Sequence, residues 1–256
     1  MFTFMASNFQ MVKIANVIGF LVTIIVNGAA NALPLNGVTT GALSDKYGNL
    51  FTPAGYVFAI WGVIYVLLAA FTYYQYTEND QGLHEKIGWL FVASCFFNSI
   101  WIFFWHYEYL ALSVLAMAGL LASLLLIYTR LEIGLVEVSR KKLLMVHTTF
   151  SVYLGWITVA PIANVAALMV AMGWEAYNIT AIYITAALIL IALLLTAINV
   201  YTRGDAAYAA VLVWALGGIV VKQMNTWLIP YIAGFSIIAI IAVVVLKKTG
   251  RLEEVF

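Results

Sequence analysis

The sequence predicts an all-α, polytopic membrane protein, and three observations support this fold class. Hydrophobic residues make up 65% of the 256 positions and charged residues only 9%, whereas a typical soluble domain has about 45–50% and about 25%. The mean hydropathy is +1.01, more than a soluble fold of this size could bury. The apolar runs are continuous, unlike the alternating segments of about ten residues in outer-membrane barrels.

Eight segments are long enough to cross a bilayer as helices of about 20 residues. Pro34 closes the first and Pro53 opens the second, because proline is tolerated at a helix start. The polar loop 77–82 precedes the third, and the turn 106–108 separates the third from the fourth. The predicted spans are 13–33, 54–75, 87–106, 109–129, 143–172, 179–201, 206–222 and 228–247.

The later spans are less sharply divided. The fifth follows the basic run 140–142 and contains Pro161, which predicts a kink. The seventh and eighth are separated by the polar turn 222–226, but a single kinked helix there would leave seven spans. A seven-helix protein that binds retinal would need a lysine within a late span, and Lys222 is the only basic residue near one. Lys222 instead ends its apolar run, and no carboxylate is placed as the counter-ion of a Schiff base. We therefore expect its ammonium group at the membrane interface.

The basic residues predict the orientation in the cell membrane. With eight spans, ten basic residues lie on the side of the N-terminus and two, Lys46 and Lys222, on the other. Because basic residues are enriched in cytoplasmic loops, we expect both termini in the cytoplasm. The ten are Lys13, Lys86, Arg130, Arg140, Lys141, Lys142, Arg203, Lys247, Lys248 and Arg251.

The first span has a competing interpretation as a signal peptide. Lys13 precedes an apolar stretch that ends in small residues, as at a cleavage site. The weak basic region and the position of Asn31 inside that site count against cleavage. Cys95, the single cysteine, cannot form a disulfide within the chain.

Three predicted spans carry stripes that combine aromatic rings with amides or hydroxyls at helical spacing. Such stripes could line a pocket for a flat, largely apolar ligand with a few polar groups. They also fit a structural role, because tryptophans anchor helices at membrane interfaces and amides bond across helices for about 0.6 kcal/mol. The candidate residues are Phe58, Trp61 and Tyr65 in the second span, Asn98 and Trp101 in the third, and Tyr153, Trp156, Ala160 and Asn164 in the fifth.

These residues carry a resemblance to the TspO/MBR family of tryptophan-rich sensory proteins and translocator proteins. The stretch Thr52-Pro53-Ala54-Gly55-Tyr56-Val57-Phe58 followed by Trp61 and Tyr65 is similar to the start of the family's second helix. Asn98-Ser99-Ile100-Trp101 matches the third helix, and Tyr153-Leu154-Gly155-Trp156 with Ala160 and Asn164 matches the fifth. Tyr56 replaces a family tryptophan, the stretch to Trp61 is one residue shorter, and Val152 replaces a proline.

The resemblance covers about residues 13–172 and implies a five-helix bundle. It also implies a cavity for porphyrins, sterols or similar ligands, capped by a loop near 35–53. We therefore expect a TspO-like ligand-binding bundle over 1–175 and three additional transmembrane helices over 176–256, to which the resemblance assigns no role. By resemblance, Trp61, Tyr65, Asn98, Trp101, Trp156 and Ala160 would line the cavity.

The favoured function is binding of a flat apolar molecule, a porphyrin or a lipid-like compound, as a sensor or carrier. A transporter of a small neutral or amphipathic solute is the first alternative, and an intramembrane enzyme acting on a lipid or tetrapyrrole is the second. No phosphate loop, metal-ligand spacing or nucleophile elbow occurs, so an enzyme is the less favoured class and no obligatory cofactor is expected. The expected partners are the lipid bilayer, a hydrophobic small molecule and, through small residues such as Gly28 and Gly217-Gly218, a second copy of the chain; nucleic acid is not expected.

Overall fold

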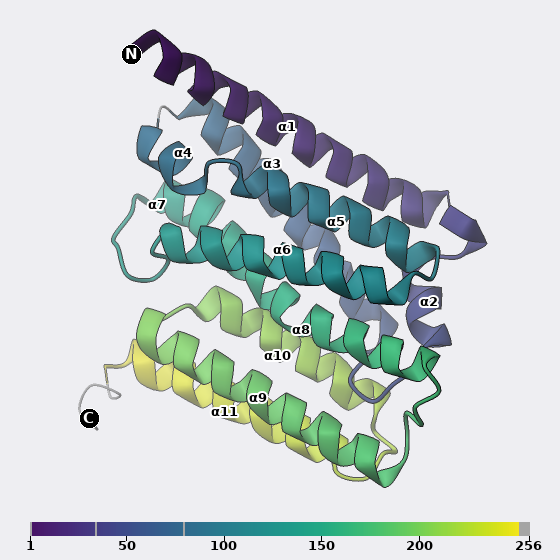
Figure 1. The fold of residues 1–256 in the computed structure, drawn as a ribbon. Coiled ribbons are helices and arrows are strands. Elements are labelled where there is room, and N and C mark those ends of the chain that lie inside the picture. Colours follow the sequence, from purple (N-terminus) through teal and green to yellow (C-terminus); the bar gives the residue numbers. More distant parts are fainter. Residues whose placement is uncertain (1, 34, 79, 251–256) are drawn as a thin grey trace. The chain divides into compact units, whose positions relative to one another are not determined.

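The computed structural model describes residues 2–33, 35–78 and 80–250. Pro34, Asn79 and Arg251, which the predicted boundaries and the charge count used, lie outside the described residues. Where the chain is described, its regular secondary structure is entirely helical (Figure 1). The elements are α1 (Phe2–Ala32), η1 (Leu35–Gly37), α2 (Thr40–Lys46), η2 (Gly55–Ala59), α3 (Ile60–Thr77), α4 (Gln81–Ile87), α5 (Leu90–His106), α6 (Leu110–Arg130), α7 (Arg140–Lys142), η3 (Leu143–His147), α8 (Thr148–Ala171), α9 (Ile179–Arg203), α10 (Ala206–Lys222) and α11 (Ile229–Lys248).

Length and apolar composition make this a polytopic helical membrane protein, as predicted. Among the described residues, six helical segments are long and apolar enough to cross a membrane, and α4 with α5, bent by 49°, would be a seventh. The apolar α10 has 17 residues, the lower limit of the roughly 17–25 residues that span a bilayer. α10 and α11 are separate helices that pack on each other, so a single kinked helix is excluded. The count of eight spans therefore depends on α10.

The chain divides into two compact units, which we describe separately. Unit 1 comprises Met1–Leu43 and Trp61–Leu154, and unit 2 comprises Ser44–Ile60 and Gly155–Phe256. The helix α8 begins in unit 1 and continues in unit 2. The boundary between Leu154 and Gly155 differs from the one expected near residue 175. The expected boundary separated a ligand-binding bundle from three additional helices, so it divided the chain by role.

In unit 1, α5 packs against both α1 and α6, and Figure 1 shows these three helices as neighbouring rows. Three phenylalanines, one each from α3, α5 and α8, form an interlocked core. The ring centroids of Phe71 lie 4.8 Å from Phe91 and 4.9 Å from Phe150, at steep interplanar angles. Such edge-to-face pairs are worth about 0.5–1.5 kcal/mol beyond their buried area, so this cluster stabilises the packing of the three helices.

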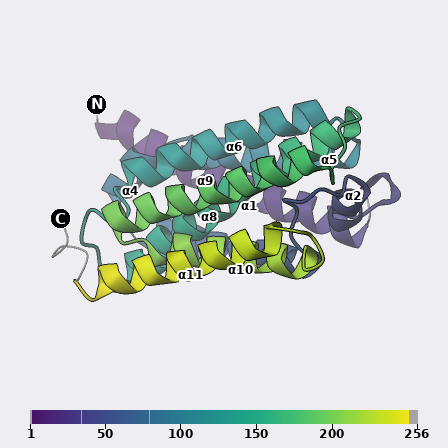
Figure 2. The same ribbon diagram turned by 90° about the horizontal axis from the view of Figure 1, so that it is seen from below.

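In unit 2, α9 and α10 both pack against α11, and α10 also contacts η2. Figure 2 shows α10 and α11 side by side. Gly204, with φ 64°, ends α9 in a left-handed cap, the conformation that glycine adopts without penalty. Asp205 then caps α10 by accepting hydrogen bonds from the amides of Ala207 and Tyr208, so two residues suffice to reverse the chain.

Three local features of the helices bear on the sequence expectations. Pro161 lies inside α8, which continues on both sides of it. The five residues before α8, Leu143–His147, form a π-helix, a geometry that is rare and often marks functional sites. The third predicted span, 87–106, is bent near its start at Gly88, whose φ is 51°, and α5 begins only at Leu90.

Candidate functional site

A row of four stacked aromatic rings from α3 and α5 is the main feature of unit 1. Trp61 stacks on Tyr65, with ring centroids 5.7 Å apart and planes 23° apart. Trp61 also stacks on Trp101 at 6.0 Å and 25°, and Trp101 stacks on Trp105 at 6.2 Å and 24°. Residues four apart lie on one face of a helix, so each helix contributes two rings to the row.

The exposure of the rings differs along this aromatic row. Trp101 and Trp105 are buried, whereas Trp61 and Tyr65 are only partly buried. Trp61 and Tyr65 are therefore the residues of the row that another molecule could reach.

Two buried polar groups lie beside the row. Asn98, fully buried on α5, donates a hydrogen bond of 3.0 Å to the hydroxyl of Tyr153 on α8. Its carbonyl oxygen accepts a 2.7 Å bond from the amide of Asn27 on α1. The ring of Tyr153 meets Trp61 edge-on, with centroids 6.1 Å apart. Asn27 was absent from the predicted site; its amide within an apolar span was the signal that could have identified it.

The first part of the predicted capping loop is fixed to the end of α5. The ring of His106 lies 2.9 Å from the hydroxyl of Thr40 and 3.2 Å from the carbonyl of Leu35. Asn36 donates to the backbone carbonyl of His106 at 3.0 Å. The segment 35–43 is thus held against the helix that carries Asn98 and Trp101.

The remaining predicted residues belong to unit 2. Phe58 and Trp156 form an edge-to-face pair with centroids 5.9 Å apart. Ala160 and Asn164 follow Trp156 on α8, with Asn164 buried. Unit 1 thus brings together Trp61, Tyr65, Asn98, Trp101 and Tyr153, and unit 2 holds Phe58, Trp156, Ala160 and Asn164.

The residues directly after the predicted capping loop, 54–57, pack on α10 within unit 2. The amide of Ala54 donates to the carbonyl of Gly218 at 3.1 Å. The indole N–H of Trp214 donates to the carbonyl of Val57 at 3.0 Å, and the ring of Trp214 meets Tyr56 edge-on. This contact gives α10 a role that its sequence did not indicate: it holds the segment that leads into α3.

Two further contacts hold the second part of the predicted capping loop, 44–53, to the end of α10. Lys222 forms an ion pair with Asp45 at 3.0 Å, a carboxylate that the sequence did not place near it, and its ammonium group lies at the end of α10. The amide of Gln223 donates to the carbonyl of Asn49 at 3.3 Å.

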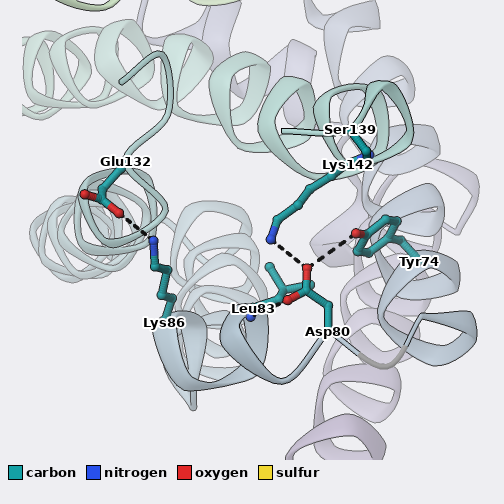
Figure 3. A network of polar contacts seen from close by, with 7 residues as sticks. All are labelled: Tyr74, Asp80, Leu83, Lys86, Glu132, Ser139 and Lys142. Atoms are coloured by element: carbon teal, nitrogen blue, oxygen red, sulfur yellow. Dashed lines mark hydrogen bonds and ion pairs between the residues drawn. The ribbon is translucent and has the colours of Figure 1, made fainter. Parts of the chain in front are cut away.

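Asp80 is the centre of a polar network at one end of unit 1 (Figure 3). Its carboxylate accepts hydrogen bonds from Lys142 at 2.6 Å, from the amide of Leu83 at 3.0 Å and from the Tyr74 hydroxyl at 3.4 Å. Burial raises the pKa of Asp80, but these bonds and the charge of Lys142 lower it more, so the pKa lies below its ordinary value.

A second ion pair lies in the same part of unit 1 (Figure 3). Lys86 on α4 contacts Glu132 in the loop after α6 at 2.5 Å, and this hydrogen bond lowers the pKa of Glu132. The residues that the structure describes contain no group of three or more His, Cys, Asp or Glu side chains that could hold a metal ion.

The helices and the buried aromatic and amide groups define a polytopic membrane protein with an aromatic cluster inside one of its units. The model of one family, described as TSPO-like protein, matches residues 13–246. The chain belongs to this family, which confirms the resemblance seen in its motifs. The match also includes α9, α10 and most of α11, which the motifs left without a counterpart. No curated protein and no solved structure matches the chain significantly.

Proposed function

We propose that the protein binds a flat, largely apolar molecule, such as a porphyrin, against the aromatic row of unit 1. The observation that carries this proposal is the stack of Tyr65, Trp61, Trp101 and Trp105, of which Trp61 and Tyr65 remain partly accessible. A planar ring system packed against the accessible parts of Trp61 and Tyr65 would add a further aromatic contact of the kind that aromatic pairs prefer.

The polar groups beside the row support a ligand that is not purely hydrocarbon. The hydroxyl of Tyr153 and the amide of Asn98 are already oriented by a hydrogen bond to each other. Pockets for small molecules combine apolar walls with a few such positioned groups. A ligand with a carbonyl or hydroxyl at its edge would therefore bind in a defined orientation.

The role that follows is that of a sensor or carrier in the cell membrane. Both termini would face the cytoplasm, and the loop 35–53, held at one end by His106 and at the other by α10, would lie on the opposite side. Trp101 and Trp105 of the row lie on α5, whose last residue, His106, holds segment 35–43, so α5 would be the physical route from binding to a signal.

Tryptophan fluorescence of the purified protein, titrated with protoporphyrin IX, tests the proposal. We expect Trp61→Ala and Tyr65→Ala each to weaken binding by roughly three- to tenfold, because an aromatic pair is worth about 0.5–1.5 kcal/mol. Trp89→Ala is the matched control, since Trp89 is exposed at the start of α5. Equal affinity of Trp61→Ala, Tyr65→Ala and the unmutated protein would exclude the site.

Two further measurements separate the neighbouring hypotheses. Trp156→Ala tests the aromatic pair of unit 2 on its own, and loss of porphyrin binding only in that variant would move the site to unit 2. Saturable solute uptake into proteoliposomes that survives Trp61→Ala would favour the transporter alternative.

A further inference from the structure

A cavity in unit 2 lies between the second half of α8 and the first half of α9. Its volume is about 420 Å³, within the range of about 300–1,000 Å³ that is usual for small-molecule sites. The loop residues Asn49–Phe51 close one side of it. Because α9 packs chiefly on α10 and α11, the space between α8 and α9 is not filled by side chains of either helix.

The cavity is elongated along the helices. On α9 its lining extends from Asn178, at the helix start, to Leu188, which corresponds to about 15 Å at 1.5 Å per residue. That length is about half of the roughly 30 Å hydrocarbon core of a bilayer. The walls are mainly aliphatic, with Pro161, Val165 and Met169 on the α8 side. An occupant would therefore be an extended molecule about as long as one membrane leaflet is thick.

One hydroxyl inside the cavity has no partner. Thr185 lines the wall and is only 7% exposed, and no other described residue forms a hydrogen bond with its side chain. Thr196 and Thr202, on the same helix, both bond to the carbonyl four residues earlier at 2.7 Å. The hydroxyl of Thr185 is therefore available in an otherwise mainly aliphatic wall, and it favours an occupant with a hydrogen-bonding group part of the way along its body.

The mouth of the cavity has a single charge. Trp174 and Glu175 lie exposed in the connection between α8 and α9, and Glu175 is the one charged residue among the described residues that line the cavity. The side-chain amide of Asn178 lies 3.4 Å from one carboxylate oxygen and so positions it. A carboxylate beside an indole ring attracts a cationic head group and repels an anionic one.

We propose that this cavity binds a single-chain amphiphile with an ammonium head, the head at Trp174 and Glu175 and the chain running past Thr185 toward Leu188. The site is separate from the aromatic row of unit 1, and the proposal does not depend on the function proposed there.

Photolabelling of the full-length protein in nanodiscs tests this proposal. The probes are a long-chain amino alcohol and a fatty acid of equal chain length, each with a diazirine on the chain, and the labelled peptides are identified by mass spectrometry. We expect the amine to label the peptides around 161–188 more strongly than the acid. Glu175→Gln should reduce this preference about two- to fivefold, in the range of exposed cationic contacts.

Variants inside the cavity provide the second readout. Ala181→Phe would fill the part of the cavity near the start of α9 and should lower labelling at least severalfold. Ile191→Phe is the control and should not lower it, because Ile191 is an exposed residue of α9 outside the lining. Thr185→Val keeps the shape and removes the hydroxyl, so it should weaken labelling by the amino alcohol.

Several outcomes would overturn the proposal. Equal labelling by the amine and the acid, unchanged by Glu175→Gln, would mean that the cavity holds only bulk membrane lipid. Labelling that persists in Ala181→Phe would place the probe elsewhere. Trp61→Ala should leave this labelling unchanged while it weakens porphyrin binding, so the two proposals fail independently.

Discussion

Gly218 is the position in α10 where a side chain has no room. A Cβ atom there would overlap the fully buried side chain of Val57 and would lie 3.0 Å from the Cβ of Pro53. The neighbouring Gly217 has no atom within 4 Å of the same test position. The surface of Gly218 is therefore used inside unit 2, and of this glycine pair only Gly217 is available to a second copy of the chain.

We expect Gly218→Ala to destabilise the protein by about 1–3 kcal/mol, the usual effect of overpacking. Gly217→Ala is the matched control and should be neutral or stabilising by up to about 1 kcal/mol, because alanine is the better helix former. The measurement is the thermal unfolding midpoint in detergent. The double variant Gly218→Ala/Val57→Ala should be more stable than the sum of the single changes; strict additivity would show that the two side chains do not collide.

At the scale of elements, Asp80 connects α3, α4 and the helical segment that starts with α7. It caps α4 through the amide of Leu83 and pairs with Lys142. Asp80→Asn keeps a good N-cap but removes the ion pair, whereas Asp80→Ala removes both. We expect a loss of roughly 0.2–1 kcal/mol from Asp80→Asn, as for other partly exposed pairs, and about 1 kcal/mol more from Asp80→Ala.

The same residue predicts a pH dependence. The pKa of Asp80 is lower in the folded protein than its ordinary value, so the unfolded chain binds the proton more readily and stability falls as the pH falls. The advantage of the unmutated protein over Asp80→Asn should be complete above about pH 5, should shrink as the pH falls below the ordinary Asp pKa of about 3.9, and should be lost only as the pH falls through the lower pKa of the folded protein. Unfolding midpoints between pH 3 and 7 measure it, and a difference independent of pH would contradict the role of the carboxylate.

Elements defined by local signals were predicted well. The apolar runs, the turn after His106 and the break between α10 and α11 follow from composition and from polar punctuation, which act over a few residues. The π-helix Leu143–His147 was not predicted. It depends on how neighbouring helices satisfy the backbone, and a single sequence does not contain that information.

At the scale of the whole molecule, the sequence identified rings of the aromatic row but not what supports them. Helical spacing placed Trp61 with Tyr65 and Asn98 with Trp101, and the structure confirms these pairs. The bond from Asn27 to Asn98 joins residues 71 positions apart, and the contact of Trp214 with Val57 joins residues 157 apart. No periodicity encodes such contacts, so the part played by α10 became visible only in the folded chain.

The crossing of the membrane by α10 is the last prediction, and it decides the topology of the whole chain. If α10 spans the bilayer, the number of spans is even and the ten-to-two division of basic residues places both termini in the cytoplasm. If α10 stays on one side, the C-terminus lies outside the cell together with Lys247 and Lys248. The test uses single cysteines in a Cys95→Ser background, introduced at the exposed positions Glu137, Met224 and Thr249. An impermeant maleimide applied to intact cells should label Met224→Cys, in the turn after α10, and leave Glu137→Cys and Thr249→Cys unlabelled until the membrane is opened. Labelling of Thr249→Cys in intact cells would show that α10 does not cross and would reduce the chain to seven spans.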